Sequence, residues 1–186
     1  MSEWALAIEQ HYHEAWGRPG EVCDFSVPIH RDGELPKDFQ VKRYGPRPDR
    51  PEWIYATFGM SQPDDKFPLE LHLYSEEPYA EIVELLYFTA HYHRTGAHLG
   101  LGHTLNFGRP WLRGSRCSFG LVSLPYPDGP KLENGVGQLK SVSFLWLIPI
   151  TAQEREFKRK HGLEALEQRF EAAAFYPPDP RRRSVI

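Results

Sequence analysis

The chain of 186 residues contains two cysteines, Cys23 and Cys117, and neither belongs to a Cys-x-x-Cys pattern. This scarcity excludes a disulfide-dense secreted scaffold and the common cysteine-based zinc sites. Two free thiols in a cytoplasmic protein are the simplest interpretation, with a single disulfide as the alternative. No apolar run approaches the ~20 residues that span a membrane. The first residues lack a basic segment followed by an apolar one, so we expect no secretory signal.

The sequence also lacks an excess of positive charge. Its 22 Lys and Arg residues against 25 Asp and Glu residues leave a net charge of −3, which does not predict a nucleic-acid partner. Hydrophobic residues make up 40% and charged residues 25% of the chain, a balance typical of globular proteins. The length suits one domain over residues 1–186 with a sizeable core.

Motifs that carry catalysis or bind metals are missing as well. The two His-Tyr-His triplets at 11–13 and 91–93 lie in expected helices, where residues two apart point in nearly opposite directions and cannot share a metal. The stretch RCSFG at 116–120 has Arg116 where a nucleophile elbow needs glycine. We therefore predict no metal, no cofactor and no enzymatic activity.

Hydrophobic periodicity predicts an α+β fold, with a mixed, mainly antiparallel sheet packed by helices. A helix is expected at 3–15, and an almost wholly apolar helix at about 77–94, capped by Ser75. Thr151 and Glu154 form a capping box that predicts a helix from about 152 to 161, and a last helix begins at 163. The expected strands are 25–30, 39–44, 53–58, 68–74, 117–123 and 139–148.

The strand at 68–74 alternates cleanly between apolar and polar residues. Leu69, Leu71 and Leu73 would face the core, with His72 on the opposite, polar side. This pattern is typical of a strand buried on one face only. We expect the apolar helix at 77–94 to pack on this sheet.

The stretch LGLGHTLNFGRPW, residues 99–111, has the look of an active-site loop because a histidine lies among glycines and polar residues. We interpret it as a structural loop in which His103 bonds a group of its own domain and binds no metal. Gly102, Thr104 and Asn106 would shape the loop with it, since glycine permits unusual backbone angles and short polar side chains bond the backbone. Trp111, if exposed, would be an interface anchor.

Acidic residues are concentrated between positions 61 and 90, whereas residues 91–116 hold four arginines and no acid. Solvated surface and complementation of the helix dipole explain part of this segregation. It also suits a charged surface that orients a protein partner. The acidic residues proposed for this partner-binding face are Asp64, Asp65, Glu76, Glu77, Glu81 and Glu84.

Several stretches in order give the chain a resemblance to a known family. They are PEWIYATFGMS, LELHLYSEE, GHTLNFG, SVSFLWLIPITAQEREF and the ending DPRRRSVI. From about Trp53 onward they resemble the suppressor of fused domain family. The resemblance implies a fold like the N-terminal domain of that family, whose work is binding. Its animal member grips a peptide of a transcription factor, partly by strand addition.

The second domain of the animal protein has no counterpart in a chain of this length, so the two-domain peptide clamp does not carry over. Short single-domain members look bacterial, and the resemblance implies a role as immunity proteins that neutralise partner toxins in polymorphic toxin systems. We therefore expect a cytoplasmic protein that neutralises a partner toxin by stoichiometric binding. The alternatives are a hydrolase-like enzyme using the His103 loop and a general regulatory adaptor.

Overall fold

The computed structural model describes residues 2–24, 35–174, 176 and 178–186. Its strands form one sheet in the order β1-β2-β3-β4-β7-β6-β5. The strands are β1 (Glu21–Val22), β2 (Gln40–Tyr44), β3 (Trp53–Phe58), β4 (Leu69–Ser75), β5 (Thr104–Asn106), β6 (Cys117–Ser123) and β7 (Ser143–Thr151). The helices are α1 (Glu3–Trp16), α2 (Ala80–Thr95), α3 (Pro130–Glu133), the 3-10 helix η1 (Gly137–Leu139), α4 (Ala152–His161) and α5 (Leu163–Ala172).

The sheet is mixed and mainly antiparallel, as the sequence predicts. Strands β4 and β7 pair in parallel, and every other neighbouring pair is antiparallel. The predicted strands at 39–44, 53–58, 68–74, 117–123 and 139–148 all join this one sheet. The strand expected at 25–30 lies outside the described residues. The edge strand β5 was not predicted, because its three residues are too few to show a pattern.

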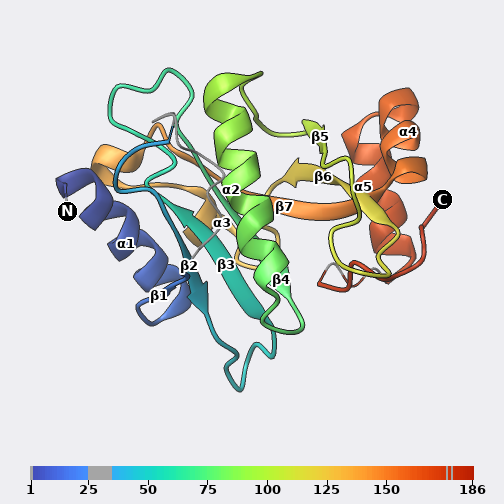
Figure 1. Cartoon of the computed structure of the whole chain (residues 1–186), viewed down its shortest axis with the longest axis horizontal. Coiled ribbons are helices and arrows are strands. Elements are labelled where there is room, and N and C mark those ends of the chain that lie inside the picture. The colour runs from blue at the N-terminus through green and yellow to red at the C-terminus, as the bar shows by residue number, and fades with distance from the viewer. Residues whose placement is uncertain (1, 25–34, 175, 177) are drawn as a thin grey trace.

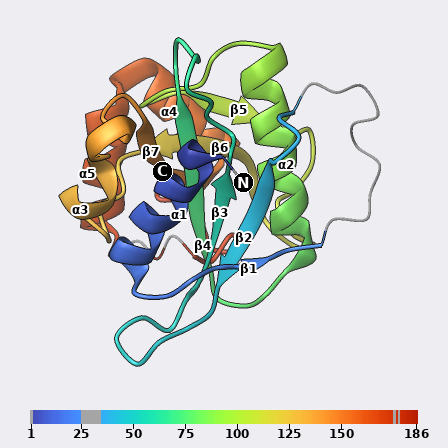
Figure 2. The same ribbon diagram turned by 90° about the vertical axis from the view of Figure 1, so that its left-hand side faces the viewer.

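Helices cover both faces of the sheet, and each face has its own apolar core. Helix α2 packs over one face, where Leu71, Leu85 and Leu147 are buried. Helices α1, α3 and α5 cover the other face (Figure 2), where Trp16, Phe144 and other aromatic side chains gather. The apolar helix predicted from the sequence thus packs on the sheet as expected.

Local capping fixes where several helices begin. The capping box at the start of α4 is present: Thr151 Oγ1 accepts from the Glu154 N–H, and the Glu154 carboxylate accepts from the Thr151 N–H. The expected cap of α2 is wrong. Its helix begins at Ala80, and Ser75 Oγ instead donates 2.7 Å to the Glu77 carbonyl. Pro78 lies before the helix, in the turn that this contact holds.

A buried ion pair ties the C-terminal segment to the start of α4, and Figure 1 shows the C-terminal end of the chain on the same side of the molecule as α4 and α5. Glu154 is fully buried, and its two carboxylate oxygens accept from Arg182 Nη1 at 2.6 Å and Nη2 at 2.9 Å. Arg182 Nη2 also donates to the Pro149 carbonyl, and the Val185 N–H donates to Glu154. Such two-pronged pairing is the strong form of an arginine–carboxylate contact.

We expect Arg182→Ala to lower the free energy of unfolding by about 3–5 kcal/mol, because it would leave the Glu154 carboxylate buried without its charged partner. Chemical denaturation measures this loss. Arg183→Ala is the matched control: the Arg183 side chain is exposed, so its removal should change stability by less than about 0.5 kcal/mol. Equal effects of the two substitutions would contradict the clamp.

The same pair should make stability depend on acid pH. Burial by itself would raise the pKa of Glu154, but the hydrogen bonds and charge of Arg182 outweigh it and hold that pKa below its usual value. The pair therefore stabilises the fold fully at pH values above the pKa that Glu154 has in the unfolded chain. This contribution is lost as pH falls through the lowered pKa. Denaturation curves of Arg182→Ala should consequently depend less on pH in the acid range.

Candidate functional site

The polar residues of β4 lie inside the molecule, which corrects the expectation of a half-buried strand. Glu70, His72 and Tyr74 are 0%, 1% and 7% exposed, respectively. Strand β4 lies between β3 and β7, and helices cover both of its faces. Polar groups in such a place must find partners within the protein. Their partners define two buried polar clusters.

Glu70 forms the first cluster. Its carboxylate accepts from Thr57 Oγ1 at 2.6 Å, and from the Ser61 N–H and Oγ at 2.9 and 2.8 Å. Trp4 Nε1 donates to the Ser61 carbonyl, which links this cluster to α1. Burial raises the pKa of Glu70 to about 7, although the hydrogen bonds act in the opposite direction. Glu70 is therefore a buried carboxyl group that titrates near neutral pH.

Asp128, in the turn after β6, is the centre of the second cluster. It accepts from Trp16 Nε1 at 2.9 Å and from the Tyr74 hydroxyl. His72 Nε2 lies 3.7 Å from the same carboxylate. Burial lowers the pKa of His72 to about 4, against the pull of Asp128, so the ring is neutral at pH 7. The carboxylate is thus held by neutral groups only.

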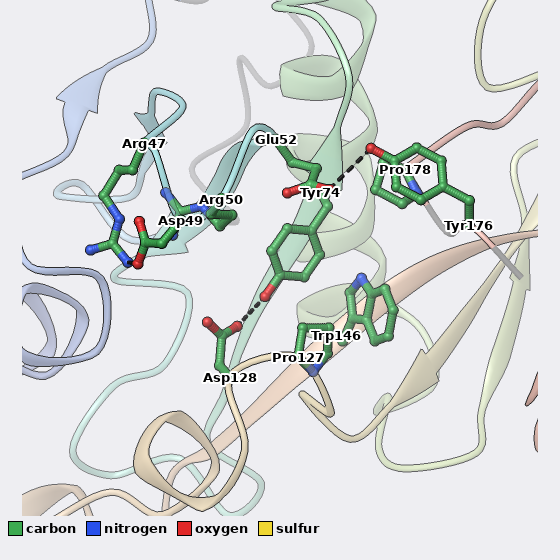
Figure 3. Close-up of a pocket in the computed structure, with 10 residues that line it drawn as sticks. All are labelled: Arg47, Asp49, Arg50, Glu52, Tyr74, Pro127, Asp128, Trp146, Tyr176 and Pro178. Atoms are coloured by element: carbon green, nitrogen blue, oxygen red, sulfur yellow. Dashed lines mark hydrogen bonds and ion pairs between the residues drawn. The ribbon is translucent and has the colours of Figure 1, made fainter. Parts of the chain in front are cut away.

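A cavity of about 360 Å³ opens beside this second cluster (Figure 3). The connection between β2 and β3 forms one wall with charged side chains, and Trp146 of β7 forms another. Tyr176 and Pro178 of the C-terminal segment close a third side, and the Tyr176 hydroxyl donates 3.0 Å to Glu52. The described lining residues are Arg47, Asp49, Arg50, Glu52, Tyr74, Pro127, Asp128, Trp146, Tyr176 and Pro178. These residues provide charged groups, which can pair with a charged ligand, and aromatic rings, which can pack against an apolar one.

The residues predicted to shape the loop at 99–111 do make local contacts. His103 is exposed, and its Nδ1 lies 3.1 Å from the His98 carbonyl oxygen. Gly102 has a φ of +77°, which suits glycine, and its carbonyl accepts from Lys158 Nζ. Asn106 Oδ1 accepts from the Gly108 N–H at 2.8 Å. Thr104 begins the edge strand β5.

The sequence analysis made Trp111 an interface anchor only if its side chain is exposed, and the structure shows that it is buried. Its side chain is 2% exposed, and its Nε1 donates 2.9 Å to the Phe119 carbonyl. The Phe107 ring packs edge-on against it at 5.2 Å. Trp111 therefore belongs to the core that holds the loop against β6.

The structure divides the predicted acidic residues between the two ends of α2. Asp64 and Asp65 lie near its C-terminal end, where Asp65 pairs with Arg94 at 2.9 Å. Glu81 and Glu84 lie in its first turns, and Glu76 and Glu77 precede it. Glu84 pairs with Arg109 of the loop. Because a 16-residue helix is roughly 24 Å long, the six acids do not form one patch.

Exposed and partly exposed apolar side chains lie on α2 and in the segments next to the edge strand β5, and we call this set the β5-edge surface. It consists of Phe88 and Tyr92 on α2 together with Leu101 and Phe107, which flank β5. The first three are 37%, 36% and 49% exposed, respectively, and the Phe88 and Phe107 rings are 5.6 Å apart. Sequence reasoning missed this surface, although the i, i+4 spacing of Phe88 and Tyr92 on a helix is a signal for it.

Three further findings concern the cysteines, metal binding and membrane-spanning helices. Cys23 and Cys117 are both free thiols, and burial raises the pKa of Cys117 to about 11. Within the described part of the chain, no group of three or more His, Cys, Asp or Glu side chains is placed to hold a metal. No described helix is long and apolar enough to cross a membrane.

The fold defines an α+β domain in which helices cover both faces of one mixed sheet. The sequence profile of the suppressor of fused protein (SUFU) family matches residues 36–183. A crystal structure from Neisseria gonorrhoeae, described as that of a candidate SUFU homolog, matches with a TM-score of 0.83 and 31% identity. It covers 99% of this chain and 97% of that one. This chain belongs to the suppressor of fused family.

More distant structures share the fold. A chain of the Sufu–Fu complex matches with a TM-score of 0.73 and 16% identity, covering 98% of this chain and 92% of that one. Drosophila Suppressor of Fused matches with a TM-score of 0.69 and 15% identity over 98% of this chain. The match spans only 51% of the Drosophila chain. Among curated proteins, none is significantly similar in sequence.

The pKa of Glu70 predicts how stability depends on pH. Between about pH 4.5 and 7 folded Glu70 retains a proton that the unfolded chain releases, so Glu70 by itself lowers the free energy of unfolding by roughly 3 kcal/mol as pH rises through this window. His72, whose pKa burial lowers to about 4, acts in the opposite direction over nearly the same window. We therefore expect the free energy of unfolding of Glu70→Gln to rise with pH more steeply than that of the unaltered chain, by about this amount. Denaturation curves measured across this pH range test the expectation.

The variant can keep most of the local hydrogen bonds, because its carbonyl can accept from Ser61 while its amide donates to Thr57. Glu164→Gln changes an exposed glutamate and serves as the control, since it should retain the pH dependence. A Glu70→Gln protein with the same dependence as the unaltered chain would show that Glu70 titrates normally.

Proposed function

We propose that this chain is a protein-binding domain that forms a stoichiometric complex and turns over no substrate. The observation that carries the proposal is the β5-edge surface. An edge strand offers unpaired N–H and C=O groups to which a partner segment can add. Exposed aromatic and aliphatic side chains beside such an edge are typical anchors for a partner.

Family membership supports the same proposal. A relative has been solved in the Sufu–Fu complex, and we extend binding of another protein to this chain as part of the proposal. We further propose that the partner is a toxin domain and that binding neutralises it in the cytoplasm. Such a role requires rapid and tight capture rather than chemistry.

The proposal predicts a toxin reading frame beside the gene for this chain, and the domain that it encodes is the partner with which neutralisation can be tested. Co-expression in a bacterial host should restore growth, and the purified pair should form a complex of fixed stoichiometry in light scattering. A complex without restored growth would favour a regulatory adaptor over an immunity protein. Catalytic turnover that His103→Ala abolishes would refute the binding proposal as a whole.

The β5-edge surface predicts which substitutions weaken the complex. Phe88→Asp and Leu101→Asp should each raise the dissociation constant by about 30-fold or more, as expected for buried anchors worth about 2 kcal/mol. Isothermal titration calorimetry with the toxin domain measures this change. Val136→Asp is the control, because Val136 is 63% exposed but adjoins η1, which contacts α1 on the opposite face. Unchanged affinity in both test variants would place the interface elsewhere.

The acidic residues at the start of α2 give a kinetic prediction. The double variant Glu81→Lys and Glu84→Lys should associate more slowly and show a weaker dependence of association on salt, because these acids would steer a basic toxin domain. Stopped-flow measurements between about 50 and 500 mM salt follow both quantities. Asp64→Lys, at the other end of α2, is the matched control. Equal rates for the double variant and the unaltered chain would exclude this acidic face.

A further inference from the structure

The cavity beside Asp128 contains charges of both signs that lack ionic partners (Figure 3). Arg47 pairs with Asp49 at 2.8 Å, so these two charges neutralise each other. Among the described residues, Glu52 accepts a hydrogen bond from the Tyr176 hydroxyl and forms no ion pair. Asp128 is 13% exposed at its side chain, and the donors that hold it are neutral.

Arg50 is the corresponding cation without a carboxylate partner among the described residues. Its guanidinium donates only to the Gly45 carbonyl, at 3.3 Å, and its Nε is buried without a hydrogen bond. Burial and the positive charge of Arg47 lower the pKa of Arg50, while the charge of Asp128 partly opposes this change. Arg50 and Asp128 thus line the same cavity, and no ion pair joins them.

The rest of the lining consists of aromatic rings and two prolines. The rings of Tyr74 and Trp146 are perpendicular with centroids 5.5 Å apart, and Tyr176 adds a third ring (Figure 3). Aromatic walls bind apolar groups by area and attract cations to their faces. The volume of about 360 Å³ falls within the range of small-molecule sites, although at its lower end.

We propose that this cavity binds a small zwitterion of the α-amino acid class. The ammonium group would lie at Asp128, the carboxylate at Arg50, and the side chain against Trp146. A simple cation would leave Arg50 uncompensated and be repelled by it, and a simple anion would meet Asp128. A ligand with both charges compensates both sides at once, which is the reason to prefer this class.

This site is separate from the β5-edge surface, so its existence does not depend on the proposed protein partner. The Tyr176–Glu52 hydrogen bond places the C-terminal segment at the opening, and the Glu154–Arg182 pair holds that segment further along. An occupant would thus contact β4, β7, the β2–β3 connection and the C-terminal segment together. It should accordingly raise the melting temperature of the whole domain.

The test is calorimetry and thermal unfolding of the full chain with each of the twenty common L-α-amino acids as probes. At least one should bind and raise the melting temperature. Its N-acetyl derivative, which lacks the cation, and its amide, which lacks the anion, should each bind at least tenfold more weakly. Equal binding of the N-acetyl derivative would indicate an anion site instead, and equal binding of the amide a cation site; either result would overturn the proposal.

Substitutions locate the site. Arg50→Gln and Asp128→Asn should each weaken binding of the same amino acid at least tenfold, whereas the exposed controls Arg113→Gln and Asp64→Asn should stay within twofold. Circular dichroism checks the fold of Asp128→Asn, and Arg50→Gln keeps the test valid if that variant unfolds. The absence of binding by all twenty probes, or binding that neither substitution weakens, would overturn the proposal.

Discussion

Burial of β4 on both of its faces is the constraint from which most of this structure follows. The strand pairs with β3 on one side and, in parallel, with β7 on the other, while α2 and α1 cover its two faces. Its leucines then pack under α2, as any buried strand requires. Its polar residues are largely removed from water, so neighbours that the fold brings there must satisfy them. His72 Nε2 is an exception, because it is buried without a hydrogen bond among the described residues.

The two polar clusters solve this problem in different ways. Glu70 is enclosed by donors from β3 and the turn after it, and it adjusts to burial by a raised pKa. His72 adjusts in the opposite direction and stays neutral. Tyr74 reaches Asp128 at the edge of the buried region, where a cavity begins. One alternating strand therefore runs from a sealed carboxyl group to a side chain that lines an opening.

The C-terminal segment contributes to both stability and the lining of that opening. Arg182 satisfies the buried Glu154, whose carboxylate also caps α4, so the tail and the helix start depend on each other. The same segment carries Tyr176 and Pro178 to the cavity. The β5-edge surface lies elsewhere on the molecule and includes apolar side chains of α2 that are exposed and not buried in the core. The domain thus separates its exposed apolar surface from its polar cavity.

The sequence by itself determined the elements whose signals are local. The capping box at Thr151, the apolar periodicity of α2 and the alternation in β4 depend on neighbours within a few residues, and they predicted the helix, the packing and the mixed sheet. The sequence could not show that both faces of β4 are covered, since that depends on helices distant in the chain. For the same reason, the sequence could not predict the burial of Trp111 or the pairing of Glu154 with Arg182. Nor could it predict that Tyr74, Asp128 and Tyr176 line one cavity. Those outcomes required tertiary structure, because burial and charge pairing are set by segments that only folding brings together.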